Sequence, residues 1–329
     1  MKRCKKCILN ENFPGISFDE DGICNFCNQH QDEEQEKILV NKYRDKFSKL
    51  IAKHRNRSSY DCIAAYSGGK DSTYTLHLLK NTFDLNILAF SFDNWYQSDY
   101  ARNNIKRVLK KLNIDLINFM PGFKAWKDII NTVVNDEFYS KKHIQRASDI
   151  CTTCISMIRF SCLKIAMEKE IPFIIFGMSP GQAPLASSIF KTNTYIVKQM
   201  QDIVYGPLKE KLGDEIDPYF LKNRHFQSSL FPYIINPLAF MKYDEEKIYD
   251  IIKSYGWEEP EDTDSNSTNC LINAMANQIH IDKYGFHPYA YELSELVRKG
   301  LLKRGKALEA VQAQQNQNII QRIKHELEL

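Results

Sequence analysis

The stretch Ser67-Gly68-Gly69-Lys70-Asp71-Ser72 decides the fold, because it joins an apolar run at 61–66 to an amphipathic run at 72–79. The apolar run predicts a buried strand, and the amphipathic run predicts the helix after it. A glycine pair at such a turn lets backbone N–H groups converge on an anion without obstruction by Cβ atoms, and the helix start adds its positive dipole end. We therefore expect an α/β fold with an anion-binding loop.

The side chains of this loop suit a phosphorylated ligand that carries a metal ion. Ser67, Ser72 and Thr73 offer hydroxyl donors, and Lys70 offers positive charge. Asp71 would repel a bare phosphate, so its presence favours a divalent cation bound to a nucleotide. The Walker loop needs Gly-x4-Gly-Lys-Ser/Thr, which this segment lacks. The loop thus predicts that a magnesium nucleotide is bound by a different phosphate-binding motif.

Outward from the loop, short apolar runs alternate with amphipathic runs. We expect strands at 61–66, 86–92, 114–119, 172–177 and 233–235, and helices at 72–79, 101–112, 124–134 and 155–168. This alternation is typical of a doubly wound parallel sheet with helices on both faces. The predicted domains are a small cysteine-bearing unit at 1–30, a connecting helix at 31–58, an α/β domain at 59–240 and a helical C-terminal region at 241–329.

Length, charge and composition indicate the cellular location of the protein but not its activity. The 329 residues carry a formal net charge of +3, which argues neither for nor against a polyanionic partner. Met1-Lys2-Arg3 leads into a cysteine pair rather than an apolar run, so we expect no signal peptide. We also expect no membrane span, because no stretch approaches roughly 18 apolar residues. These features predict a cytoplasmic protein whose nine cysteines are metal ligands or redox groups rather than disulfides.

Two cysteine pairs near the start have the spacing of a metal site. Cys4-x2-Cys7 and Cys24-x2-Cys27 are separated by 16 residues. Two such knuckles can close a tetrahedral thiolate site, for which zinc is the usual metal. Four thiolates leave no open coordination position, so we interpret this zinc as structural.

A second set consists of Cys151, Cys154 and the distant Cys270. The first two precede the helix expected at 155–168, which places them near the carboxyl edge of the sheet, where open α/β folds bind ligands. Three thiolates can hold a [4Fe–4S] cluster and leave one iron open. A persulfide-carrying pair and a structural pair are the alternatives.

Two residues near these cysteines have further candidate roles. Arg159 lies on the helix after Cys154 and could face bound phosphates. Asp264 precedes Cys270 and is a candidate helix N-cap. Both assignments rest on position along the chain alone.

The string at 67–72 matches the signature of the PP-loop ATP pyrophosphatases, and it directly follows an apolar strand, as in that superfamily. The chain resembles this superfamily, whose fold is a doubly wound, HUP-like α/β sheet and whose enzymes split ATP between the α and β phosphates. The resemblance implies that Lys70 and Asp71 act in catalysis with Mg²⁺. It also implies an ATP site at the ends of the first, second and fourth strands, made of Ser67, Gly68, Gly69, Lys70, Asp71, Ser72, Thr73, Phe92, Asp93 and Gly177.

The opening of the chain, from Cys4-x2-Cys7 through Pro14-x-Ile16-x-Phe18-Asp19-x-x-Gly22 to Cys24-x2-Cys27, resembles that of the N-acetyl sugar amidotransferases. The likeness continues at 60–72 and 165–177, and covers about half of the chain. In that family, ammonia from a partner glutaminase replaces the activated oxygen. This chain departs from the family by its cysteine pair at 151–154. It also has Gly177-Met178-Ser179-Pro180-Gly181-Gln182 where an acidic segment is expected after the fourth strand.

The cysteines instead resemble those of the iron–sulfur tRNA-thiolation enzymes. That branch combines N-terminal zinc, a Ser-Gly-Gly-x-Asp-Ser loop and three cluster cysteines arranged as a Cys-x2-Cys pair and one distant Cys. Cys151, Cys154 and Cys270 fit this arrangement in type and order. The resemblance implies that these three cysteines are catalytic and hold a [4Fe–4S] cluster.

Three hypotheses follow for the whole chain. The first is an ATP-dependent sulfur transferase, which adenylates a substrate oxygen and replaces it with sulfur from a donor. The alternative is a sugar amidotransferase that takes ammonia from a glutaminase, and the third is a nucleotide-binding regulatory module without turnover. The acceptor stays open among a small molecule, a sugar and a tRNA. No membrane partner is expected, and a homodimer is one expectation because related PP-loop enzymes are often dimers.

Overall fold

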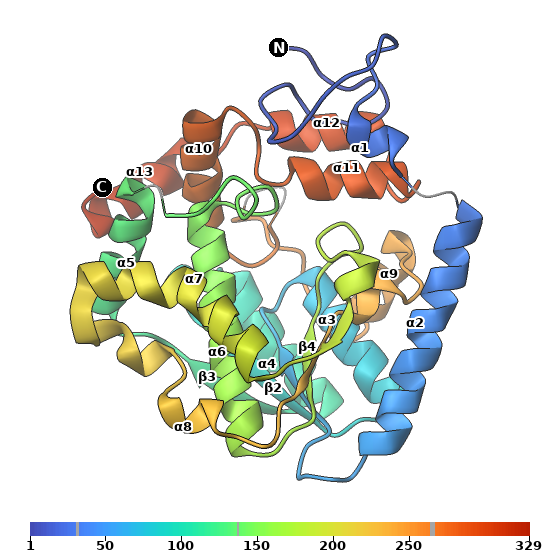
Figure 1. Cartoon of the computed structure of the whole chain (residues 1–329), viewed down its shortest axis with the longest axis vertical. Coiled ribbons are helices and arrows are strands. Elements are labelled where there is room, and N and C mark those ends of the chain that lie inside the picture. Colours follow the sequence, from blue (N-terminus) through green and yellow to red (C-terminus); the bar gives the residue numbers. More distant parts are fainter. Residues whose placement is uncertain (31–32, 137, 264–266) are drawn as a thin grey trace.

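A mostly parallel six-stranded sheet forms the centre of the molecule (Figure 1). The computed structural model describes residues 1–30, 33–136, 138–263 and 267–329, so Asp264 lies outside the described residues. The strand order is β3-β2-β1-β4-β6-β5, and only β5 runs antiparallel to its neighbour. The strands are β1 (Cys62–Ala65), β2 (Ile87–Phe92), β3 (Asp115–Phe119), β4 (Phe173–Phe176), β5 (Ile189–Lys191) and β6 (Tyr233–Ile235). The fold class predicted from the sequence is confirmed.

Side chains alternate between two buried cores along the central strands, as the period of a strand requires. In β1, Ile63 belongs to one core, whereas Cys62 and Ala64 belong to the other. β4 repeats the pattern, with Ile174 in the first core and Ile175 in the second. Apolar residues on both faces explain why these strands read as continuous apolar runs.

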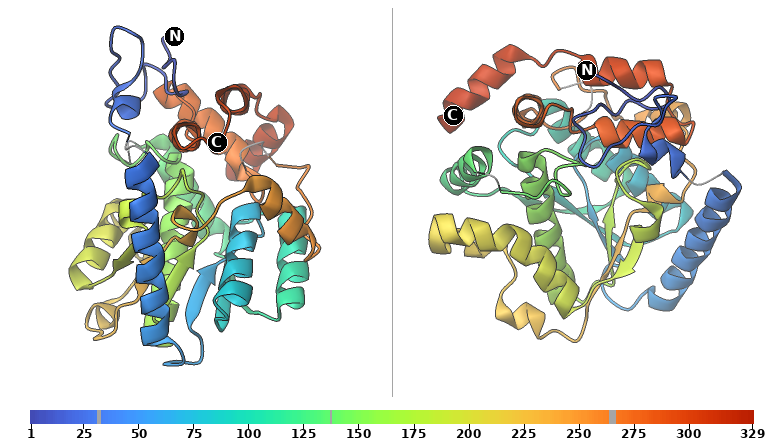
Figure 2. Two further views of the ribbon diagram at one scale, coloured as in Figure 1. Left: turned by 90° about the vertical axis from the view of Figure 1, so that its right-hand side faces the viewer. Right: turned by 45° about the horizontal axis from the view of Figure 1, so that its top comes forward.

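Helices cover both faces of the sheet (Figures 1 and 2). The first core is closed by α5 (Phe123–Asn135), α6 (Asp149–Glu168) and α7 (Thr194–Leu212). The second is closed by α2 (Glu33–His54), α3 (Lys70–His77), α4 (Asp99–Leu112) and α9 (Glu245–Lys253). The predicted connecting helix and the four helices predicted between the first four strands are therefore present, with shifted bounds.

The C-terminal region is helical, as predicted, and lies at the end of the molecule that carries the N-terminal unit (Figure 2). It consists of α10 (Ile272–Tyr284), α11 (Ala290–Arg298), α12 (Arg304–Gln312) and α13 (Gln317–Leu327). The remaining helical segments are short: α1 (Asn25–Asn28), α8 (Asn223–Phe226), the π-helical turn Leu78–Thr82, and the 3₁₀ turns Leu185–Ser187, Gly213–Tyr219 and Pro237–Ala239.

The order in which the chain adds strands to the sheet reverses next to β1. The chain runs from β1 to β2 and β3 on one side, then returns to place β4 on the other side of β1. Ligands of open α/β sheets bind outside the carboxyl ends of the strands at such a reversal. The loop at 67–72 follows β1, and Gly177 follows β4, so both lie at this position.

Two segments differ from the sequence-based expectations. The edge strand β5 and the helix α7 are additional elements that the sequence analysis did not include. Helix α6 begins at Asp149, so Cys151 and Cys154 lie within its first turns rather than before it. The reason is Ser148, whose hydroxyl accepts a hydrogen bond from the Cys151 N–H and caps the helix.

Helix α6 also corrects the expectation that no stretch is long and apolar enough for a membrane span. By length and composition it could cross a membrane, with a mean hydropathy of 1.5 over its 18-residue window. Half of that window is buried inside the fold, and the helix packs against β1, β4, α5, α7 and α10. A helix surrounded in this way is apolar on most sides, so its composition follows from its position in the core.

Candidate active site at the carboxyl edge of the sheet

The loop after β1 is shaped by two close backbone approaches. Gly68 has φ +78°, and a Cβ atom there would come within 2.4 Å of the Ala101 carbonyl oxygen, so only glycine fits. At the end of β4, a Cβ atom on Gly177 would lie 2.7 Å from the Cα of Ser72. The start of α3 therefore presses against the ends of both central strands, and its N-terminus faces the sheet edge.

The hydroxyls of Ser67 and Ser72 lie 3.2 Å apart and both line the cavity described below. Helix α3 starts at Lys70, with Gly69 as its N-cap. Thr73 points elsewhere: it is fully buried and its hydroxyl donates to the Gly69 carbonyl at 2.8 Å. Within this loop, the two serines are therefore the hydroxyls placed to meet a phosphate.

Lys70 and Asp71 are held by residues of the segment that leads into α9. Lys70 forms an ion pair with Glu245, and its Nζ atom lies 3.9 Å from an Asp71 oxygen. The Tyr243 hydroxyl donates to Asp71 at 2.9 Å. Burial raises the pKa of Asp71, although Lys70 and Tyr243 oppose that shift. Burial alone would lower the pKa of Lys70, but the carboxylates of Asp71 and Glu245 raise it above its usual value.

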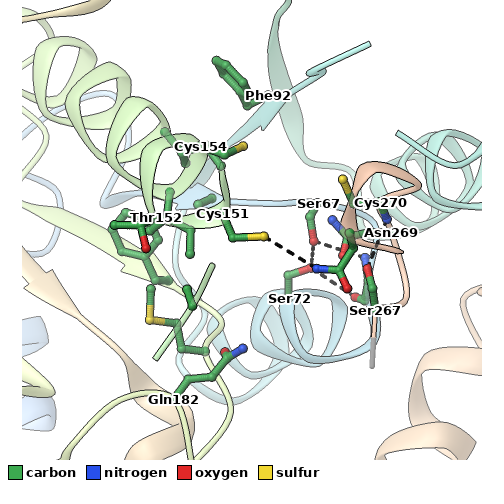
Figure 3. Close-up of a pocket in the computed structure, with 18 of the residues that line it drawn as sticks. Ser67, Ser72, Phe92, Cys151, Thr152, Cys154, Gln182, Ser267, Asn269 and Cys270 are labelled. Atoms are coloured by element: carbon green, nitrogen blue, oxygen red, sulfur yellow. Dashed lines mark hydrogen bonds between the residues drawn. The ribbon is translucent and has the colours of Figure 1, made fainter. Parts of the chain in front are cut away.

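A cavity of about 500 Å³ opens where β1, β2, β4, α6, α10 and α11 meet (Figure 3). Most of the residues predicted from the sequence line it: Ser67, Gly69, Lys70, Asp71, Ser72, Phe92, Cys151, Cys154, Gly177 and Cys270. Gly68, Thr73 and Asp93 are not among the described lining residues. Asp93 turns instead to Arg102, 3.3 Å away, and accepts a hydrogen bond from the Trp95 N–H.

Cys151, Cys154 and Cys270 all line this cavity, although Cys270 lies 116 positions after Cys154 in the sequence. Figure 3 shows Cys151 and Cys154 on α6, across the cavity from Cys270. Cys270 is fixed by its neighbours, because the Leu271 N–H donates to the Tyr96 carbonyl at 2.8 Å and Gln97 bridges to Cys270. Hydrogen bonds to the loop after β2 thus hold the segment that contains Cys270 at the cavity wall.

These thiols affect one another electrostatically. Burial raises the pKa of Cys154 well above its usual value, and Cys270 and Cys151 add to the rise. Burial likewise raises the pKa of Cys270 to about 11, with an opposing hydrogen bond from Asn94. Among the described residues, the sulfurs of these three cysteines do not form a group within 4.8 Å of one another, as the four N-terminal sulfurs do. The spacing is wider than a single tetrahedral ion requires.

The cavity wall contains a carboxylate, Glu292, that the sequence analysis did not identify. Glu292 on α11 accepts a hydrogen bond from the Ser179 hydroxyl at 2.6 Å, and burial raises its pKa to about 7. It supplies a carboxylate to the segment at 177–182, which has none of its own. A Cβ atom on Gly181 would lie 2.4 Å from the Glu292 carbonyl oxygen, so Gly181 was the local signal of a close approach.

Arg159 lines the cavity, as its position suggested. Its Nε atom is buried and has no hydrogen-bond partner among the described residues, and burial lowers the pKa of its guanidinium. A buried cation without a carboxylate partner is costly unless an anion binds beside it. The residue therefore suits an anionic ligand.

The four N-terminal cysteines form a compact, buried group. The Cys4 and Cys27 sulfurs are 3.9 Å apart, and the Cys7 and Cys24 sulfurs are 3.6 Å apart. Tetrahedral zinc with bonds of about 2.3 Å needs sulfurs about 3.8 Å apart, so the donor set fits zinc. The hydrogen bond from Cys27 lowers the pKa of Cys7 to about 5, which favours a thiolate at that position.

This N-terminal unit holds α11 in place. The Ile8 N–H donates to the Ser294 hydroxyl at 3.3 Å, and Phe13 stacks on Tyr291 with ring centroids 5.8 Å apart. Arg304 of α12 donates to the carbonyl of Cys7 at 2.9 Å. Because Glu292 lies between Tyr291 and Ser294 on α11, the four-cysteine unit supports one wall of the cavity.

Comparisons with known proteins place these features in context. No protein-family model matches the chain. Uncharacterized protein MJ1599 of Methanocaldococcus jannaschii is 29% identical over 248 residues, which cover 75% of this chain and 71% of that protein.

Solved structures are similar to the chain at lower identity. The U34-tRNA thiolase NcsA from Methanococcus maripaludis, solved with its [4Fe-4S] cluster, is 16% identical with a TM-score of 0.37, and the match covers 100% of this chain and 89% of that one. The NMN synthetase from Francisella tularensis is 14% identical with a TM-score of 0.37, over 92% and 98% of the two chains. These structural neighbours are PP-loop enzymes, and at such identities and TM-scores they assign no activity to this chain.

Proposed function

We propose that this chain is a PP-loop ATP pyrophosphatase that adenylates a substrate oxygen and replaces it with sulfur. One observation carries the proposal: three cysteines from two distant segments line the same cavity as the Ser-Gly-Gly-Lys-Asp-Ser loop. A phosphate-binding loop beside a set of thiolates joins the two halves of such a reaction in one site. The acceptor is a small molecule, a sugar or a tRNA, and we place the reaction in the cytoplasm.

In the first half-reaction, magnesium ATP binds with its phosphates at the start of α3. The Ser67 and Ser72 hydroxyls and the helix N-terminus meet the phosphates, and Asp71 would hold the metal ion. The acceptor oxygen attacks the α phosphorus, the bond to the bridging oxygen breaks, and pyrophosphate leaves with the electron pair. Lys70 and Arg159, two of the cations that line the cavity, would stabilise charge on the departing group.

In the second half-reaction, sulfide at the level of hydrosulfide attacks the activated carbon, the carbon–oxygen bond breaks, and AMP leaves. Oxygen is exchanged for sulfur without a change of oxidation state at carbon. The donor set of Cys151, Cys154 and Cys270 fits a [4Fe–4S] cluster, because three thiolates line one cavity at a spacing wider than a single ion needs. Such a cluster supplies an iron without a protein ligand, at which sulfur can be presented.

The sugar amidotransferase remains the second candidate, on the strength of the N-terminal cysteine segment. It shares the loop, the metal-bound ATP and the adenylate, but ammonia from a glutaminase would take the place of hydrosulfide. It gives Cys151, Cys154 and Cys270 no part in the chemistry. The two candidates therefore differ in what happens when these thiols are removed.

The test begins with anaerobic purification of the whole chain, followed by iron, sulfide and zinc analysis and a visible spectrum. We expect about four irons and one zinc per chain, with the iron lost in Cys151→Ala and the zinc retained. Cys162→Ala, which removes a buried thiol on the same helix, is the matched control. A colourless protein that holds zinc alone after reconstitution with iron and sulfide would overturn the sulfur-transfer assignment in favour of the amidotransferase.

The adenylation step has its own test. Binding of magnesium ATP, followed by calorimetry, is expected to weaken at least tenfold in Asp71→Asn because the carboxylate that would hold the metal is lost. Asp128→Asn is the control, because Asp128 pairs with Lys124 on α5 and is not among the cavity-lining residues. Unchanged ATP affinity in Asp71→Asn would contradict the placement of the metal-bound phosphates.

A further inference from the structure

Two buried amides point their N–H groups at the cavity cysteines. Asn94 is 5% exposed and donates from Nδ2 to the Cys270 sulfur at 3.3 Å. Asn273 is 3% exposed and donates from Nδ2 to the Cys151 sulfur at 3.6 Å. The sulfurs of Cys270 and Cys151 therefore each have an amide donor.

The orientation of each amide is fixed by what its oxygen accepts. The Asn94 Oδ1 atom accepts a hydrogen bond from the Tyr96 N–H at 3.1 Å, so the Asn94 NH₂ group must face the sulfurs. The Asn273 Oδ1 atom accepts from Asn277 at 3.0 Å. Neither amide can turn over without losing a buried hydrogen bond, which costs about 1–3 kcal/mol for an unsatisfied group.

The backbone conformation of the next residue, Trp95, helps to direct the Asn94 side chain toward Cys270. Trp95 has φ +71°, a value that bulky residues rarely adopt and that costs about 1–3 kcal/mol. The turn is held by the side chain of Asp93, which accepts from the Trp95 N–H at 3.0 Å. This strained turn directs Asn94 into the cavity at the end of β2.

A neutral thiol is a weak hydrogen-bond acceptor and gives little reason to bury two oriented amides. A thiolate is a strong one, because hydrogen bonds to an ionised acceptor are roughly twice as strong as neutral ones. We propose that Asn94 and Asn273 are positioning residues whose N–H groups hydrogen-bond to the sulfurs of Cys270 and Cys151 and raise the reduction potential of an iron–sulfur cluster bound there. The inference rests on the proposed function. Hydrogen bonds to the sulfurs of such a cluster are among the factors that set its potential.

Asn94→Asp separates this role from the role of the turn. The aspartate keeps an oxygen for the Tyr96 N–H but replaces the N–H donor with a carboxylate oxygen beside the sulfurs. Asn273→Asp does the same at Cys151 and keeps the acceptor for Asn277. Asn113→Asp makes an identical change at an exposed residue that ends α4 with φ +52°, and is the matched control.

The measurement is a redox titration of the anaerobically purified whole chain, followed by its visible and electron paramagnetic resonance spectra. In Asn94→Asp we expect the ratio of reduced to oxidised cluster at a fixed potential to fall at least tenfold, which equals ~59 mV for a one-electron couple. Asn273→Asp is expected to shift the ratio in the same direction, and Asn113→Asp is expected to leave it unchanged. Iron, zinc and the melting temperature are measured on the same samples.

The outcomes separate the inference from the function on which it rests. A wild-type protein without iron after reconstitution overturns both. Wild-type iron with an unchanged potential in Asn94→Asp and Asn273→Asp overturns the inference alone. If Asn94→Asp loses its iron or fails to fold, the result for Asn273→Asp decides. A cluster potential lower than that of the Asn113→Asp control supports the inference, and an unchanged potential overturns it.

Discussion

The two cysteine groups of this chain use the same side chain in opposite settings. Cys4, Cys7, Cys24 and Cys27 come from one short segment, are buried, and have sulfurs within 4.8 Å of one another. Cys151, Cys154 and Cys270 come from a helix and a distant loop, are partly exposed, and line a cavity. The sulfurs of the first group face one another in a buried cluster, whereas those of the second group face a cavity beside the loop at 67–72.

The donors around the sulfurs differ in the same way. The Cys4 sulfur accepts backbone N–H groups of Cys7 and Cys24 at 3.4 and 3.2 Å, which any sequence with this loop geometry would supply. The cavity sulfurs accept side-chain amides of Asn94 and Asn273. The first group also receives a side-chain donor, because Arg298 donates to the Cys27 sulfur at 3.8 Å. The two groups therefore differ in the charge of their side-chain donors, which is a guanidinium at the first group and a neutral amide at the second. The following experiments test this contrast.

The largest effect on stability is expected when one of the four N-terminal cysteines is removed. Cys24→Ala removes one of the four thiols whose arrangement fits a zinc ion, and zinc binding in zinc-finger peptides contributes about 10–16 kcal/mol of apparent free energy. We expect the unit at 1–30 to lose zinc and unfold, which limited proteolysis and zinc analysis would detect. The contrast would break if Cys24→Ala kept its zinc and its protease resistance.

In the second group, we expect a substitution to change the free energy of unfolding less but to reduce the formation of the sulfur-containing product strongly. Cys151→Ala should reduce the replacement of oxygen by sulfur at least 100-fold, about 2.7 kcal/mol, because it removes a thiolate of the reactive set. In the cluster-free chain, the free energy of unfolding should change by less than about 1 kcal/mol, since the side chain borders a cavity. Denaturant unfolding and a sulfur-transfer assay measure the two quantities. An equal loss of stability in Cys151→Ala and Cys24→Ala would show that both groups are structural.

Glu292 links the two regions, because the N-terminal unit supports the helix that carries it. Its raised pKa means that the folded protein binds more protons than the unfolded chain between about pH 4.5 and about pH 7, so stability falls as pH rises through that window. Glu292→Gln removes the titration and should flatten the profile, with a gain of about 1–3 kcal/mol above pH 7. Melting temperatures from pH 4 to 8 test this. A parallel profile in Glu292→Gln would assign the pH dependence to other groups.

The smallest effect is expected at a cysteine that belongs to neither group. Cys162 is fully buried on α6, two turns beyond Cys154, and burial raises the pKa of its thiol. Cys162→Ala should cost about 1 kcal/mol from lost packing and leave iron and zinc unchanged. Denaturant unfolding and metal analysis give both values. Loss of iron in this variant would show that the cluster ligands include a residue outside the cavity set.

The sequence by itself determined the features that depend on short stretches of chain. The loop at 67–72, the alternation of strands and helices, and the two Cys-x2-Cys knuckles each rest on spacing within about 30 residues, so local geometry fixes them. The expected strands at 61–66, 86–92, 114–119, 172–177 and 233–235 all have counterparts in the sheet. β5 was missed because its two apolar residues, Ile189 and Phe190, stand between polar residues and form no longer apolar run.

The tertiary structure alone decided what surrounds the loop. That Cys270 meets Cys151, that Glu292 faces the segment after β4, and that Asn94 and Asn273 point at sulfur all depend on how α6, α10 and α11 pack over the sheet edge. Asp93 shows the converse, because its place after β2 predicted a nucleotide contact, whereas its side chain turns to Arg102. Contacts between residues distant along the chain arise from packing of whole elements, and no local pattern records which side chains that packing brings together.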